Sequence, residues 1–165
     1  MLDTPSFQES QAVDDSSGRS RLPNPDYHYF QIYGNIGGDC TNFVSQCLFA
    51  GGIEQVIDSV APWWYKDKNN WAIAWINAHS LYWCLKIRDR QKLTGPRGSE
   101  VDSVDELELG DLIFYENING GIDHVGIITG FRYGLPTITQ HSPELVNISY
   151  LKTNKSKMYF MKISS

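Results

Sequence analysis

The 165-residue sequence has no apolar run that could span a bilayer and no cluster of basic residues. Its longest apolar stretches, such as residues 112–115, fall far short of the ~20 residues that cross a membrane. The 14 Lys and Arg stand against 19 Asp and Glu, which gives a net charge of −5. Nucleic acids and anionic membranes require a clustered basic face. We therefore expect no membrane span and no nucleic-acid partner.

Cysteine is scarce, and its pattern excludes several kinds of site. Cys40, Cys47 and Cys84 are odd in number and include no Cys-x-x-Cys pair, which argues against a disulfide framework and a four-thiolate zinc site. Cys40 and the histidines also lack the short paired spacing of metal ligands, so we predict no metal and no cofactor. A serine nucleophile is not indicated, because no Gly-x-Ser-x-Gly turn occurs. We expect three free thiols.

The first residues lack the basic start and the apolar stretch of a signal peptide, so we predict no export address in this polypeptide. We interpret the chain either as a domain of a longer secreted protein or as a protein that is exported by a route other than a signal peptide. Residues 1–22 are rich in Ser, Asp and Gln, which predicts a flexible or weakly helical arm. Pro23 and Pro25 break any helix there. At 13% aromatic, the remaining residues 23–165 indicate one folded domain.

Apolar spacing predicts a helix over residues 40–50. Cys40, Phe43 and Val44 begin a stripe at i, i+3 and i+4, Asp39 stands at the N-cap position, and two glycines follow the last turn. Residues 62–90 contain a second helical region behind an irregular start. Residues 91–106 are polar and rich in turn formers, which predicts a loop with a short helical turn near residues 104–107.

After residue 111 the sequence pattern becomes typical of strands, which we predict at residues 112–115, 124–130, 136–142 and 157–163. Short strands bounded by Gly and Asn favour an antiparallel meander. Helices followed by strands indicate an α+β domain in which helices cover one face of a small sheet.

Cys40 is the best candidate for a nucleophile. At the N-terminus of a helix, unpaired N–H groups and the helix dipole favour a thiolate. An isolated cysteine on an apolar stripe is more often a core residue, and Cys47 and Cys84 fit that interpretation.

A histidine and a polar pair could complete a catalytic group with Cys40. His124 opens an apolar strand, from which it could take the thiol proton and later protonate a leaving amine. One strand later, Gln140 or His141 could orient the imidazole of His124. Strand alternation favours Gln140 unless a bulge reverses it, whereas the directional ring nitrogen favours His141.

The block GGDCTNFVSQCLFAGG, residues 37–52, resembles the signature of the putative amidase domain family, a branch of the papain-like cysteine peptidases and amidases that includes NlpC-like and CHAP domains. The similarity continues through NPDY at 24–27, the spaced tryptophans of 62–83, Gly-Asp at 110–111, His-Val-Gly at 124–126 and Gln-His-Ser at 140–142. It covers about residues 23–151. The resemblance implies an α+β papain-like fold in which the cysteine-bearing helix packs on a small antiparallel sheet.

The resemblance also implies roles for individual residues. Cys40 would be the nucleophile, His124 the base, and His141 the orienting residue with Gln140 second, so that His141→Ala would cost more activity than Gln140→Ala. Asp39 is expected to direct its carboxylate at backbone donors, because a carboxylate beside the sulfur would raise the thiol pKa. The further candidates for the oxyanion site or the pocket wall are Asn35, Asp39, Asn42, Trp63 and Trp64.

These features together predict a cysteine amidohydrolase. By resemblance, its substrate is an amide bond of bacterial peptidoglycan or a peptide, and the protein is secreted or associated with the cell wall. A cognate inhibitor or the rest of a parent chain would be a further partner. The alternatives are a protein-directed peptidase or acyltransferase effector, and a catalytically silent binding module. The presence of both Cys40 and His124 argues against a catalytically silent module.

Overall fold

The computed structural model describes residues 12–13, 22–31 and 38–165. Most of the predicted arm, residues 1–22, therefore lies outside the described residues. Within the described part, the two-residue strands β1 (Ala12–Val13) and β2 (Leu22–Pro23) pair antiparallel.

An antiparallel sheet of six strands forms the centre of the molecule, in the order β5-β10-β6-β7-β8-β9. Its strands are β5 (Arg97–Val101), β6 (Leu112–Glu116), β7 (Ile122–Arg132), β8 (Leu135–Gln140), β9 (Leu145–Ser149) and β10 (Lys157–Ser164). The predicted meander is present as β6 to β9, while β10 inserts between β5 and β6. The loop predicted at residues 91–106 is wrong in part, because these residues contain β5. Strand β9 was also not predicted from the sequence. The predicted helical turn is η1 (Val104–Glu106).

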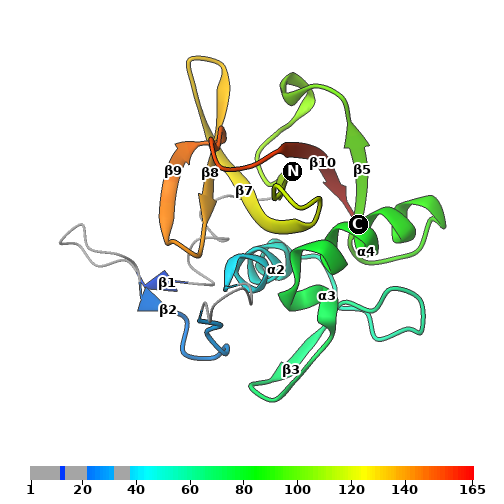
Figure 1. Cartoon of the computed structure of the whole chain (residues 1–165). Coiled ribbons are helices and arrows are strands. Elements are labelled where there is room, and N and C mark those ends of the chain that lie inside the picture. The colour runs from blue at the N-terminus through cyan, green and yellow to red at the C-terminus, as the bar shows by residue number, and fades with distance from the viewer. Residues whose placement is uncertain (1–11, 14–21, 32–37) are drawn as a thin grey trace.

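Three helices lie together on one side of this sheet (Figure 1). Helix α2 (Cys40–Ala50) has the predicted bounds. The second helical region begins later than predicted, with α3 (Ile73–Ile76) and α4 (Ala78–Arg90). The residues before it form a hairpin of β3 (Tyr65–Asp67) and β4 (Asn70–Trp71). Asn77 separates the two helices, because its extended backbone ends α3 and its side chain accepts a bond from the Ser80 N–H, 2.9 Å away, at the start of α4.

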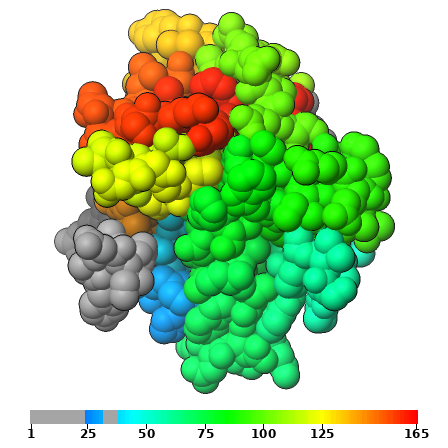
Figure 2. Space-filling model, turned by 45° about the vertical axis from the view of Figure 1, so that its right-hand side comes forward, coloured from blue at the N-terminus to red at the C-terminus, as the bar shows by residue number. Residues whose placement is uncertain are grey.

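Both faces of the sheet are covered, and each has its own apolar cluster. On the helix side, α2 and α4 pack on alternate residues of the central strands, such as Leu112, Val125 and Ile127. The opposite cluster consists of Leu107, Ile113, Tyr115, Ile128, Ile138 and Tyr150. In Figure 2 the green residues of α4 and of the β3–β4 hairpin lie in the lower part of the visible face, and the yellow to red strands lie above them. The fold is therefore α+β, as the sequence predicts.

Candidate functional site

Helix α2 starts at Cys40 and brings this residue against strand β7. The side chain is buried, at 4% exposure. Its Sγ accepts a hydrogen bond from the backbone of Val125, the residue after His124, and lies 3.7 Å from the Thr41 hydroxyl. The first turn of the cysteine helix therefore meets the strand at the position of the predicted base.

Burial governs the charge of this thiol. Desolvation raises the pKa of Cys40 above its ordinary value, and the nearby charge of Asp39 raises it further, against the lowering effect of the Thr41 and Val125 bonds. The sequence favoured a thiolate on the strength of the helix N-terminus. In the structure, the cost of burying the sulfur outweighs that stabilisation, so the resting group is a neutral thiol.

His124 on β7 contacts Gln140 at the end of β8. The His124 Nε2 and the Gln140 Oε1 lie 2.9 Å apart, and the two residues are 8% and 1% exposed. Burial lowers the pKa of His124 to about 4, assisted by the positive charges of Lys152 and Lys155, although the Gln140 bond acts in the opposite direction. The imidazole is therefore neutral at pH 7 and able to accept a proton.

His141 is not the residue that contacts His124. Its Nδ1–H donates to Oδ2 of Asp39 over 2.7 Å, and its ring stacks on Phe43 of α2 with centroids 4.4 Å apart. The reason is strand alternation on a sheet with two covered faces. Gln140 lies in phase with Ile138 on the face of His124, whereas His141 points toward α2. Our preference for His141 therefore does not match the geometry.

Asp39 occupies the N-cap position but does not cap the helix with its side chain. Its Oδ1 instead accepts bonds from the Phe30 N–H at 3.0 Å and the Asn42 amide at 2.9 Å, and its Oδ2 accepts the His141 bond. The backbone N–H of Asp39 donates to the Ser142 hydroxyl over 2.7 Å. Asp39 thus ties the helix start to the end of β8, with its carboxylate held by these three donors.

The remaining candidates divide between the core and the undescribed part of the chain. Both ends of the Asn42 amide are occupied, by the His28 carbonyl and Asp39 on the nitrogen and by the Trp75 indole on the oxygen, so it is not an oxyanion donor. Trp63 is fully buried and donates to Ser45, which corrects its assignment to a cleft wall. Trp64 is half-buried. Asn35 lies outside the described residues.

Lys152 is a site residue that sequence reasoning missed. Its Nζ donates to the Gln140 Oε1 over 2.5 Å and lies 5.1 Å from the centre of the Tyr115 ring. Desolvation lowers the pKa of Lys152, while the proximity of Cys40 raises it. No motif marks this residue, which lies in the polar segment between β9 and β10.

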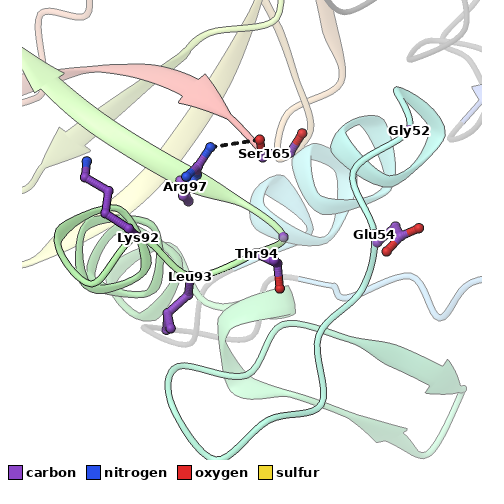
Figure 3. Close-up of a pocket in the computed structure, with 8 residues that line it drawn as sticks. Gly52, Glu54, Lys92, Leu93, Thr94, Arg97 and Ser165 are labelled. Atoms are coloured by element: carbon purple, nitrogen blue, oxygen red, sulfur yellow. Dashed lines mark hydrogen bonds between the residues drawn. The ribbon is translucent and has the colours of Figure 1, made fainter.

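Elsewhere in the fold, a pocket is built by the end of α2, the end of α4, and β5 (Figure 3). It contains none of the site residues named above, and its lining includes Arg97, which donates to the Ser165 carbonyl over 2.8 Å.

Across residues 12–13, 22–31 and 38–165, no group of three or more His, Cys, Asp or Glu side chains is arranged to hold a metal ion. The helices in this part are all too short or too polar to cross a membrane.

Comparisons with known proteins place the chain in a family. It is 35% identical over 99 residues to the uncharacterized protein YhbB of Bacillus subtilis, which covers 58% of this chain and 30% of that protein. It is 27% identical over 135 residues to the uncharacterized protein YjcM of the same organism, covering 76% of this chain and 28% of that protein. The chain thus spans less than a third of both relatives. No solved structure matches it. Residues 9–162 match the family described as Putative amidase domain, whose name denotes hydrolysis of amides. The chain therefore belongs to the putative amidase domain family.

Proposed function

We propose that this domain is a papain-like cysteine amidohydrolase in which Cys40 is the nucleophile and His124 the general base. One observation carries the proposal: the sulfur of a helix-opening cysteine bonds the strand backbone next to His124, whose Nε2 is held by Gln140. Nucleophile, base and orienting group occur together in this way in cysteine hydrolases. A cysteine helix packed on an antiparallel sheet also supports the papain-like relation.

The pKa shifts favour a mechanism that starts from neutral groups. Burial raises the pKa of Cys40 and lowers the pKa of His124, so a resting thiolate–imidazolium pair is disfavoured. The thiol proton therefore passes to His124 as the sulfur attacks the amide carbonyl. The imidazolium that forms is stabilised by the Gln140 oxygen, 2.9 Å from Nε2. It then protonates the leaving amine and leaves a thioester on Cys40.

Hydrolysis completes the cycle. Neutral His124 removes a proton from water, the hydroxide attacks the thioester, and the acid product and the thiol are released. The tetrahedral intermediates carry an oxyanion, for which the first N–H groups of α2 are donors because a helix start leaves them without intrahelical partners. Among these, we propose the backbone N–H of Cys40 as a donor to the oxyanion.

For the substrate, we propose an amide bond of bacterial peptidoglycan. The family, whose name denotes amide hydrolysis, supports the type of bond. The bacterial cell wall is proposed from the resemblance of residues 37–52 to the amidase branch that includes NlpC-like and CHAP domains. We infer on the same basis that the domain acts outside the cell or in the cell wall.

Digestion of purified peptidoglycan tests the reaction and the substrate together. The wild type is expected to release soluble fragments detectable by mass spectrometry, and Cys40→Ala and His124→Ala are expected to release none. Cys47→Ala is the matched control, because this buried thiol lies two turns later on the same helix. Equal release by the wild type and Cys40→Ala would refute the cysteine mechanism.

Alkylation by iodoacetamide separates the mechanism from the substrate. We expect Cys40 to be labelled faster than Cys84, which is buried in α4 and bonded to the Ala61 carbonyl, and we expect His124→Ala to remove this difference. If Cys40 reacts no faster than Cys84, the nucleophile assignment is wrong. Rapid labelling of Cys40 without any release from peptidoglycan would instead redirect the search to protein substrates.

A further inference from the structure

The amide of Gln140 is held in one orientation by partners of opposite kinds. Its oxygen accepts a bond from the Lys152 ammonium at 2.5 Å, and its nitrogen donates to the Pro143 carbonyl at 3.2 Å. An ammonium can only donate and a carbonyl can only accept. A flip of the amide would set NH₂ against NH₃⁺ and oxygen against oxygen, so the two contacts exclude it.

This orientation determines the tautomer of His124. The Gln140 oxygen lies 2.9 Å from Nε2, and it can only accept, so Nε2 must carry the hydrogen. In a neutral imidazole the other nitrogen is then unprotonated. Nδ1 is therefore the atom left to receive the thiol proton.

Lys152 reaches this position from a segment that is itself anchored. The buried Tyr115 hydroxyl donates to the Tyr150 carbonyl over 2.7 Å, two residues before Lys152. The Tyr115 ring also lies close to both partners of the Gln140 oxygen, with the His124 ring 5.6 Å from its centre and the Lys152 Nζ 5.1 Å from it. The ammonium is thus half-buried at a fixed place beside the amide that orients the base.

We propose that Lys152 is a positioning residue: by bonding the Gln140 oxygen, it holds the amide in the orientation that keeps hydrogen on Nε2 of His124 and leaves Nδ1 as the base. The mechanistic part rests on the proposed function. The part that concerns the tautomer rests on the contacts of Gln140 alone. Lys152→Met is the direct test, because it keeps the length of the side chain and removes the donor.

Nitrogen NMR of the His124 ring distinguishes the two tautomers without any substrate. The wild type is expected to show hydrogen on Nε2, and Lys152→Met to show a mixture, with Lys152→Arg restoring the wild-type pattern. Lys155→Met is the matched control. Lys155 also lowers the pKa of His124, but its ammonium bonds Asp123 at 2.6 Å, so its loss should raise that pKa without changing the tautomer. An unchanged tautomer in Lys152→Met would overturn the proposal.

Kinetics on peptidoglycan provide the second readout. We expect kcat of Lys152→Met to fall about tenfold or more with little change in KM, since orientation of a general base affects turnover. A rise in KM alone would mean that Lys152 binds substrate, and would overturn the positioning role. If Lys152→Met does not fold, Lys152→Ala serves instead, because it also removes the donor to the Gln140 oxygen, and hydrogen on Nε2 alone in that variant would overturn the proposal. An inactive wild type would refute the proposed function, while the NMR comparison would still decide the role of Lys152.

Discussion

Burial and hydrogen bonding act on Cys40 and His124 in opposite directions, and the balance leaves both groups neutral. The helix N-terminus and the bonds from Thr41 and Val125 favour the thiolate, but the sulfur lies almost wholly out of water. Desolvation lowers the pKa of the His124 imidazole by more than the Gln140 bond raises it. A site of this kind generates the thiolate only as the sulfur attacks an electrophile, when His124 takes the thiol proton.

Replacing Gln140 with alanine is expected to lower mainly turnover, whereas replacing His141 with alanine is expected to lower mainly stability. Gln140→Ala removes the acceptor of the His124 bond and should lower kcat by about 10- to 100-fold with a small loss of stability. His141→Ala removes a donor from the buried Asp39 carboxylate and should cost about 2–3 kcal/mol of unfolding free energy. Turnover and urea denaturation measure the two effects. A larger loss of kcat in a stably folded His141→Ala would return the orienting role to that residue.

At the scale of elements, the end of β8 joins the two parts of the site. Three consecutive residues make three different attachments: Gln140 to His124 on β7, His141 to the Asp39 carboxylate, and Ser142 to the Asp39 N–H. The helix that carries the nucleophile and the strand that carries the base are thus positioned by one short segment. Their relative placement depends on the packing of α2 and α4 against the sheet.

Gly98 on β5 allows α4 to approach the sheet. A Cβ at this position would lie 2.9 Å from the Cβ of Leu85 and 2.7 Å from the sulfur of Met161. The Leu85 Cβ is fixed to the helix backbone, so Gly98→Ala should push α4 outward and cost about 1–3 kcal/mol in urea denaturation. Gly121→Ala is the control, because the nearest atom there is 3.5 Å away. Equal unfolding free energies for the two variants would contradict this packing argument.

Arg88 of α4 connects two loops to that helix. It is fully buried, and it donates to the carbonyls of Val60, at 2.8 Å, and Thr94, as well as to the Asp58 carboxylate. Arg88→Met removes the charged donor from both carbonyls and from Asp58, and should cost about 2–3 kcal/mol in urea denaturation. Asp58→Asn should cost less than about 1 kcal/mol, because the Asp58 side chain is 46% exposed. A similar loss in both variants would show that the ion pair, and not the carbonyl bonds, stabilises the loops.

At the scale of the whole molecule, the two apolar clusters lie on opposite faces of one sheet, so a loss of sheet structure disrupts both. His124 lies where β7 meets the cysteine helix, and its protonation therefore bears on the stability of the entire fold.

Acid should destabilise the protein through His124. Its pKa is lowered from 6.5 to about 4 in the folded state. Between these two pH values the unfolded chain binds the proton more strongly than the folded protein does. The contribution of neutral His124 to the free energy of unfolding is therefore complete above about pH 6.5, and it is lost as the pH falls toward about 4. The difference corresponds to about 3 kcal/mol. Urea denaturation of the wild type and His124→Asn across this range isolates the effect. Parallel pH profiles would show that His124 titrates normally in the folded protein.

The sequence alone determined the local features. Helix α2 was predictable because its apolar stripe, N-terminal residue and glycine stop are encoded within about a dozen neighbouring residues. Four strands, the α+β class and the family followed from similar local patterns. β5 was not predictable from its residues, since RGSEV has no apolar alternation and becomes a strand by pairing with β10 some 60 positions later.

Tertiary structure decided which neighbours the site residues have. His141 is about 100 positions from Asp39, and its choice of that partner over His124 depends on both faces of the sheet being covered. The neutral state of Cys40 depends on its burial, and the role of Lys152 on a bond to a strand that precedes it in the chain. Spacing in a sequence reports the periodicity of one segment, whereas desolvation and side-chain hydrogen bonds depend on segments that only folding brings together.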